Sequence, residues 1–328
     1  MFFWDNIDTP LGFFTFFCAI LVVFVNGWTD APSALFSVVA SKTLKLWQGA
    51  ILSAIFNFLG VFLCSLIGGK VAESIFSLAS LQTELEGSII CISCFLSVII
   101  FGVVAWLFGM PSSESHALIS SLAGASLALG GFRADLIIQI LKILLFMVLS
   151  CVLSYFLSFG IAKLFLKRKL PFKGLLIFGC ASLSFMHGGQ DGQKFIAIMM
   201  FLLGVSQKEE LKIPFVLVAL VSIVMSLSTL LGGKKIINSL SKSVENLDTP
   251  LAFSSDLGSF VALGICSVLG MPVSTGNIKS LSIVGAGASQ KKQINKKIIT
   301  EILLTSVITF PICFLLGFFI CKTLFFVI

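Results

Sequence analysis

Long apolar stretches recur along the chain and leave little sequence between them. The stretches 47–67, 88–108 and 298–328 each contain at least 21 residues, and about 20 apolar residues suffice for a helix to cross a bilayer. The chain is 57% hydrophobic and only 11% charged, whereas soluble domains carry about 25% charged residues. The sequence therefore predicts an all-α polytopic membrane protein without a sizeable soluble domain.

Four polar segments rich in Gly, Pro and Ser interrupt this apolar pattern. They are residues 26–33, 110–116, 187–194 and 271–277. Irregular backbone at membrane depth is tolerated only where protein or a water-filled cavity covers it. Four such segments in one chain therefore indicate broken helices that surround a common site.

The spacing of the polar segments indicates an internal duplication. The interval from Asp30 to Pro111 is identical to the interval from Asp191 to Pro272, so the second half repeats the spacing of the first without a gap. An odd number of crossings in each half would make the second repeat inverted, with hairpin-like half-helices meeting at a central site, which is a common transporter architecture. We expect transmembrane repeat 1 at 10–130, a connecting helix and basic loop at 131–171, repeat 2 at 172–288, and a C-terminal helix at 289–328.

Loop charges predict the orientation in the membrane. The net charge of +7 would suggest nucleic acid as a partner for a soluble protein, but here the basic residues lie in short loops between apolar stretches. Loops 41–46, 163–173, 234–248 and 291–297 are basic, whereas loop 68–87 carries three Glu and one Lys. Cytoplasmic loops carry such a basic excess. We therefore expect five crossings in each repeat, both termini outside, and a multi-pass protein of the cytoplasmic membrane that binds no nucleic acid.

Two aspartates at matched positions suggest a cation site. Asp30 and Asp191 lie in apolar surroundings, where an ionised side chain is costly and usually faces a partner or an ion pathway. Thr29 and Gln190 sit beside them and add neutral oxygens, which hard cations favour. The alternatives are a structural ion pair or acids at the membrane surface. An aspartate that takes up a proton would serve H⁺ coupling, but the extra oxygens favour Na⁺ slightly.

Hydroxyl residues follow two matched prolines and suggest an anion site. Proline suits the first helical turn, so a half-helix should begin near Pro111 and near Pro272. The free N–H groups and the positive dipole end of a helix N-terminus bind anions. Two such ends, one from each repeat, could hold one oxyanion between them, although ordinary helix capping by serine is the alternative. The candidate residues are Ser112, Ser113, Ser115, Ser274 and Thr275.

Other polar residues of these segments have less specific roles. We expect His116 and His187 to support the local structure, since a lone histidine is more often a hydrogen-bonding residue than a ligand. Lys194 either neutralises the bound anion or pairs with Asp191, and the role of Glu114 is left open, as is that of Lys279. The sequence contains no GxxxxGK[ST] phosphate-binding loop, which argues against primary transport by this chain alone.

The four segments together resemble the inorganic phosphate transporter family, also called the PiT or PHO4 family of membrane symporters. This family carries two Gly-Ala-Asn-Asp-like and two Pro-Val-Ser-Thr-Thr-His-like motifs, compared here with 27–34, 187–194, 111–116 and 272–277. The resemblance implies phosphate binding by Ser112, Ser113, Ser115, Ser274, Thr275, Asn277 and Lys194, and cation binding by Asp30, Asp191, Thr29, Gln190 and Ser33. The sequence departs from the family where Thr29, Gln190 and Ser33 replace asparagines, where Gly276-Asn277 replaces Thr-His, and at Glu114.

The resemblance and the motifs lead to one expected function. The chain should carry inorganic phosphate across the cytoplasmic membrane by symport with Na⁺ or H⁺, through alternating access. Transport of sulfate or another oxyanion, or an anion channel, are the alternatives. We expect no enzymatic activity and no cofactor apart from the coupling ion, and a homo-oligomer is left open.

Overall fold

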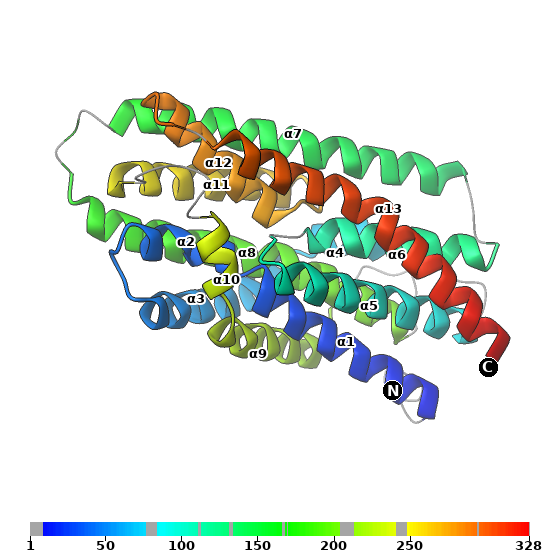
Figure 1. The fold of residues 1–328 in the computed structure, drawn as a ribbon. Coiled ribbons are helices and arrows are strands. Elements are labelled where there is room, and N and C mark those ends of the chain that lie inside the picture. The colour runs from blue at the N-terminus through cyan, green and yellow to red at the C-terminus, as the bar shows by residue number, and fades with distance from the viewer. Residues whose placement is uncertain are drawn as a thin grey trace.

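The structure is a computed structural model that describes residues 9–76, 84–110, 113–130, 134–165, 168, 170–203, 213–240, 248–293 and 295–327. Every regular element among these residues is an α-helix, which confirms the predicted all-α class. The helices, shown in Figure 1, are α1 (Pro10–Thr29), α2 (Pro32–Ala40), α3 (Leu46–Ile67), α4 (Lys70–Phe76), α5 (Glu84–Leu107), α6 (Glu114–Ala128), α7 (Ala134–Phe165), α8 (Phe172–Leu202), α9 (Phe215–Leu231), α10 (Lys234–Leu240), α11 (Thr249–Val268), α12 (Thr275–Ser289) and α13 (Lys296–Val327).

Length and hydropathy confirm that the protein is built to cross a membrane several times. Within the described part of the chain, six helical segments are long and apolar enough to span: Pro10–Ala40, Leu46–Ile67, Glu86–Leu107, Ile137–Phe165, Thr249–Val268 and Ile299–Val327. A shorter apolar helix covers Phe215–Leu231. Helix α8 has 31 residues, but the polar segment 187–194 lies in its interior. The five crossings per repeat stay a prediction.

The two aspartate segments differ in backbone structure, which corrects one expectation. The chain breaks between α1 and α2 at Asp30 and Ala31, whereas α8 runs unbroken through Asp191. When the two halves are aligned without gaps at their aspartates, Pro32 corresponds to Gln193. Proline lacks a backbone N–H and interrupts a helix, while glutamine keeps its N–H and lets α8 continue. The expected break at 187–194 is therefore wrong.

The two proline segments break as predicted and begin two antiparallel half-helices. α6 begins at Glu114 and α12 at Thr275, each three residues after its proline. Figure 1 shows that both start in the middle of the bundle, and that α6 runs toward the end where α1 begins while α12 runs toward the opposite end. Their N-termini therefore face each other at the centre of the molecule.

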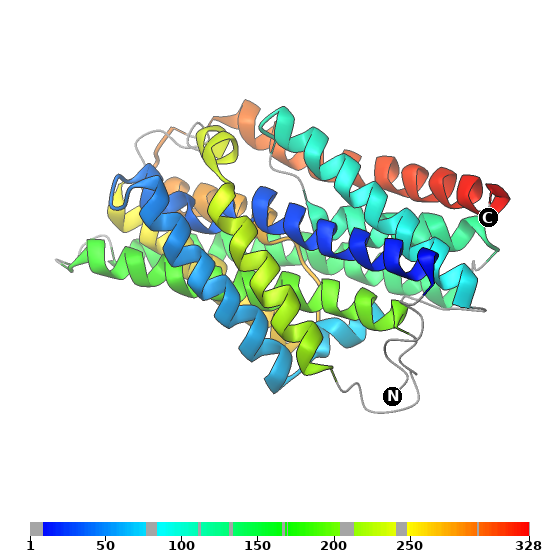
Figure 2. The same cartoon turned by 90° about the horizontal axis from the view of Figure 1, so that it is seen from below.

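The outer helices are exchanged between the two halves of the chain. α7 packs on α11 and α12, whereas α13 packs on α5 and α6. In the same way α3 packs on α8, and α9 packs on α1. Figure 2 shows α3 and α9 side by side on one face of the bundle. These reciprocal contacts are what the duplication would produce, although the division at residues 130, 171 and 288 stays a prediction.

The ends of the bundle agree with the charge pattern. The start of α1 and the end of α13 lie at one end of the bundle (Figure 1). The turn between α2 and α3, which carries Lys42 and Lys45, and the end of α7, which carries Lys163, lie at the other end. The start of α1 and the end of α13 are thus on the same side, and the external location of the termini stays a prediction.

Two glycines at matched positions allow close helix contacts, and this generates a stability prediction. A Cβ atom at Gly124 would lie 2.0 Å from the carbonyl oxygen of Phe314 in α13, and one at Gly285 would lie 2.2 Å from that of Tyr155 in α7. Overpacking costs about 1–3 kcal/mol, occasionally more. We expect Gly124→Ala and Gly285→Ala each to lower the free energy of unfolding by at least this amount, measured by thermal unfolding in detergent micelles.

The matched control is Gly160→Ala in α7, because a Cβ there meets nothing within 4 Å. Alanine also favours helix over glycine by about 1 kcal/mol, so this variant should not be destabilised. Equal melting temperatures for Gly160→Ala and Gly285→Ala would contradict the close packing of α7 on α12.

Candidate functional site

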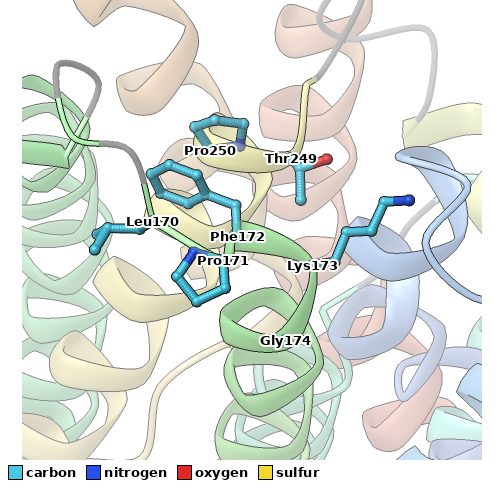
Figure 3. Close-up of a pocket in the computed structure, with 7 residues that line it drawn as sticks. All are labelled: Leu170, Pro171, Phe172, Lys173, Gly174, Thr249 and Pro250. Atoms are coloured by element: carbon cyan, nitrogen blue, oxygen red, sulfur yellow. The ribbon is translucent and has the colours of Figure 1, made fainter.

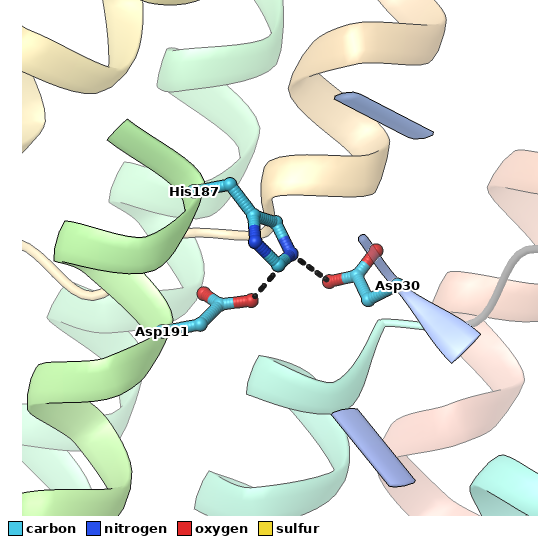
Figure 4. Close-up of side chains that lie close together, drawn as sticks. All are labelled: Asp30, His187 and Asp191. Atoms are coloured by element: carbon cyan, nitrogen blue, oxygen red, sulfur yellow. Dashed lines mark ion pairs between the residues drawn. The ribbon is translucent and has the colours of Figure 1, made fainter. Parts of the chain in front are cut away.

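Two carboxylates and one imidazole meet at the centre of the bundle. Nε2 of His187 lies 3.4 Å from Oδ2 of Asp191 and 4.0 Å from Oδ2 of Asp30. His187 and Asp191 are one turn apart on α8, and Asp30 comes from the break between α1 and α2 (Figure 4). One ligand atom from each residue falls within 4.8 Å of the others, and all three side chains are buried. The structure thus brings together the two aspartates that the sequence singled out.

The orientation of His187 leaves this cluster short of positive charge. Its Nδ1 lies 3.1 Å from Oδ1 of Asn57, and the amide nitrogen of Asn57 donates to Oγ1 of Thr229 at 3.0 Å. An amide oxygen only accepts hydrogen bonds, so Nδ1 carries the proton. Nε2 has no hydrogen-bond partner among the described residues, and in the neutral ring its lone pair faces two carboxylates. A cation or a proton at Nε2 relieves that repulsion.

Asp191 has compensating partners on both of its oxygens. Nζ of Lys194 donates to Oδ1 at 2.6 Å, and the side-chain amide of Asn26 donates to Oδ2 at 3.3 Å. Asp30 accepts a hydrogen bond from Oγ1 of Thr275 at 2.9 Å. A buried carboxylate without such partners would be very costly, so the two acids depend on residues from α1, α8 and the start of α12.

The half-helix N-termini meet beside this acidic pair. Oγ of Ser113 accepts from the backbone N–H of His116, and Oγ of Ser274 accepts from that of Asn277, each at 3.3 Å. Both serines are therefore N-caps, as the capping alternative predicts. Across the centre, Ser115 donates to the carbonyl oxygen of Val273 at 2.9 Å. The first N–H groups of a helix lack intrahelical partners, so two sets of such groups converge here.

Other predicted site residues point to neighbouring helices. Thr29 donates to the carbonyl oxygen of Val25 and contacts Glu114. Ser33 donates to the backbone oxygen of Asp30. Further contacts are those of Gln190 with Ser267 and of Asn277 with Ser306. Ser112 lies outside the described residues. The structure thus joins Asp30, Asp191, Thr275, Lys194 and Ser115 directly, and it places the side chains of Gln190 and Ser33 elsewhere.

Sequence reasoning gave no site role to Asn26 or Asn57, and it left the role of Glu114 open. It expected His187 to support the local structure, whereas the ring faces both aspartates. Glu114 is buried in α6, and its Oε2 has no partner among the described residues. Asn26 and Asn57 hold Asp191 and His187, respectively. Asn26 lies in a recognised polar segment, but Asn57 lies in an apolar stretch, where a lone amide was the only available signal.

A second buried ion pair lies outside this cluster. Nζ of Lys279 contacts Asp256, and it donates to Ser37 and to Ser255 at 2.7 Å each. The pair ties α2, α11 and α12 together. Because its ammonium is satisfied by these oxygens, Lys279 serves packing of the three helices in this conformation.

A surface pocket is separate from the buried cluster. It has a volume of about 530 Å³ and is lined by residues 170–174, at the start of α8, and by Thr249 and Pro250 of α11 (Figure 3). Among these residues only Lys173 is charged. The pocket therefore lacks the paired acids and converging N–H groups, and we place the functional site at the central cluster.

Comparisons with known proteins identify the family. The family model described as "Phosphate transporter family" matches residues 26–171 and 165–317. A probable low-affinity inorganic phosphate transporter of Bacillus subtilis (strain 168) is 30% identical over 312 residues, which cover 92% of this chain and 93% of that protein. A protein of the same description from Rhizobium meliloti (strain 1021) is 30% identical over 307 residues, covering 89% of this chain and 90% of the relative.

A solved structure shares the fold. The structure described as the sodium-dependent phosphate transporter superposes with a TM-score of 0.87 at 17% identity, covering 98% of this chain and 100% of its own. The family model matches nearly the whole length, and it includes all four polar segments that build the central cluster. The chain is therefore a membrane protein of the phosphate transporter family, which is a family of transporters and not of enzymes.

Proposed function

We propose that the protein carries inorganic phosphate across the cytoplasmic membrane by symport with a cation, Na⁺ or H⁺, through alternating access. The observation that carries this proposal is the convergence of two half-helix N-termini on a pair of buried carboxylates. The first feature suits an oxyanion and the second suits a cation. The relatives named as phosphate transporters, and the similar structure named as sodium-dependent, support the choice of cargo.

The cation site of this proposal lies between Asp30, Asp191 and His187. A cation there would neutralise the two carboxylates that now face the ring nitrogen at 3.4 and 4.0 Å. The hydroxyl of Thr275 lies next to the same position, 2.9 Å from Asp30 and 3.4 Å from Asp191. In this arrangement Thr29, Gln190 and Ser33 act indirectly, by holding the surrounding helices.

The phosphate site lies between the starts of α6 and α12. Ser113 and Ser274 occupy the two caps, where each oxygen accepts from the backbone and each hydroxyl proton can turn to the anion. For Ser113 this means leaving Nδ1 of His116, which it contacts. Ser115 and Thr275 lie in the first turns of the two half-helices. Phosphate would take its hydrogen bonds from these hydroxyls and from the free N–H groups, with Asn277 at the edge. For Ser115 this means leaving the carbonyl oxygen of Val273, to which its hydroxyl donates.

Thr275 provides a physical link between the two cargoes. Its hydroxyl donates to Asp30. A cation bound at Asp30 replaces that hydrogen bond and frees the hydroxyl to donate to phosphate. The exchange makes the binding of each cargo favour the other, as linkage requires.

Uptake into proteoliposomes tests this function. We expect radiolabelled phosphate to accumulate when an inward Na⁺ gradient or an inward H⁺ gradient is imposed separately, and to exchange with unlabelled phosphate on the opposite side. Asp30→Asn should abolish gradient-driven accumulation while membrane insertion persists, because the cluster loses one of its two charges.

The alternatives give different results in the same vesicles. A channel would show no accumulation stimulated by phosphate on the opposite side, and a sulfate carrier would show stronger competition by sulfate than by phosphate. Accumulation that ignores both gradients, or normal coupled uptake by Asp30→Asn, would contradict the proposed symport.

The half-helix site generates a second prediction. A hydrogen bond to a charged group contributes about 1.5–3 kcal/mol, so losing one hydroxyl should weaken phosphate binding roughly 10- to 150-fold. Ser113→Ala and Ser274→Ala should therefore show comparable losses of phosphate affinity, and the double variant should be close to inactive. Binding titrations on purified protein at matched concentrations measure the effect.

Serines deeper in the same half-helices provide matched controls. Ser120 and Ser280 donate to backbone carbonyls one turn earlier in α6 and α12, so Ser120→Ala and Ser280→Ala should leave phosphate affinity unchanged. If Ser113→Ala and Ser274→Ala reduce only the yield of folded protein, the serines are caps and nothing more, and the proposed phosphate site is wrong.

A further inference from the structure

The ammonium group of Lys194 is enclosed by oxygen atoms. Its Nζ donates to Oδ1 of Asp191 at 2.6 Å, to Oγ of Ser115 at 2.5 Å and to the carbonyl oxygen of Val273 at 2.6 Å. The side chain of Lys194 is 2% exposed. An ammonium group has three donors, and all three are used within the protein. Lys194 therefore has no donor left for phosphate in this conformation.

These three ligands form the shell of a cation site. A carboxylate, a hydroxyl and a backbone carbonyl are the oxygen ligands that hard cations take in proteins. A lysine ammonium is a compact point charge, and here it occupies the centre of that shell. The ligands come from three segments, α8, α6 and the residue before the α12 cap, so the position is built by the same convergence that builds the central cluster.

The other half of the molecule has no such lysine. In the gapless alignment of the two halves, Ser33 corresponds to Lys194. Ser33 donates to a backbone oxygen, and the carboxylate of Asp30 meets Thr275 and the ring of His187. Among the described residues, no lysine or arginine nitrogen lies within 4.0 Å of Asp30. The ammonium of Lys194 thus pairs with Asp191, whereas Asp30 has no lysine or arginine partner among the described residues.

A second difference between the two halves of the chain involves the same cluster. Glu114 corresponds to Thr275 in the same alignment, so the cluster that contains the extra ammonium also contains an extra carboxylate. Relative to the residues at the corresponding positions of the other half, Lys194 adds one positive charge and Glu114 adds one negative charge. The two formal charges therefore cancel within the cluster. This pairing is expected if Lys194 is a fixed part of the electrostatics of the site and its charge is balanced within the protein.

We propose that Lys194 is a tethered cation, which occupies the position of an exchangeable ion at Asp191, so that Asp30 provides the remaining exchangeable site. This inference rests on the proposed cation coupling and deepens it. It states that one residue, Lys194, limits how many exchangeable cations the protein binds. Replacing the lysine by the serine of the first half opens the second site to a free ion.

The test counts bound cations and does not depend on transport. Radiolabelled Na⁺ binding to the purified full chain, with choline chloride as the ionic-strength control, should rise by one Na⁺ per chain in Lys194→Ser. Without Na⁺, Asp191 loses its charge partner, so the melting temperature of Lys194→Ser should fall. Adding Na⁺ should restore it, and choline should not.

A double variant controls for the origin of the extra ion. Lys194→Ser combined with Asp191→Asn lacks the carboxylate, so it should show neither the additional Na⁺ nor stabilisation by Na⁺ beyond that of the unmodified protein. Lys194→Gln, which keeps side-chain length and offers an oxygen, serves as a second single variant.

Two results would overturn the inference. One is an unchanged Na⁺ count in Lys194→Ser with weakened phosphate binding, which would make Lys194 a phosphate ligand. The other is failure of both single variants to fold in Na⁺, because a free ion should replace the ammonium. Uptake of phosphate by the unmodified protein is measured separately, so loss of the proposed function is distinguishable from loss of this inference.

Discussion

The burial of Asp30 and Asp191 within an apolar bundle is the constraint on which the rest of the site depends. A charged side chain at the centre of a membrane helix costs about 2.5–3.5 kcal/mol on insertion scales, so each acid needs partners. Asp191 takes Lys194 and Asn26, and Asp30 takes Thr275. Lys194 lies on the same helix as Asp191, but Asn26 and Thr275 come from polar segments far away in the sequence, which must therefore meet the acids.

Close helix contacts make that meeting possible. Membrane helices lack a hydrophobic force between them and associate through small residues that let backbones approach. A Cβ at Gly188 would lie 2.3 Å from the backbone oxygen of Asn57, and one at Gly60 would lie 1.9 Å from that of Phe185. The contact of α3 with α8 thus brings Asn57 within reach of His187. The close contacts at Gly60 and Gly188 therefore determine the orientation of the His187 ring. That orientation leaves the lone pair of Nε2 without a hydrogen-bond donor among the described residues.

The sequence was sufficient for features set by spacing and by proline, and insufficient for those set by side-chain direction. The half-helices after Pro111 and Pro272 and the pairing of the aspartates were predicted, since matched intervals identify equivalent positions. The unbroken α8 was not predicted, because a Gly-rich polar segment indicates a break equally well when no proline is present. Gln190 and His187 show the second limit. Both lie in one segment of α8, yet Gln190 contacts Ser267 while His187 faces the acids. The packing of the neighbouring helices around α8 determines which of the two side chains faces the acids.

The most direct test of the central claim is an experimentally determined structure of the protein with phosphate bound, together with the coupling cation. The account predicts phosphate density between the starts of α6 and α12, within hydrogen-bond distance of Ser113 and Ser274, and cation density between Asp30 and His187. Phosphate bound elsewhere, for example in the surface pocket at residues 170–174, with the central cluster unchanged, would contradict the account.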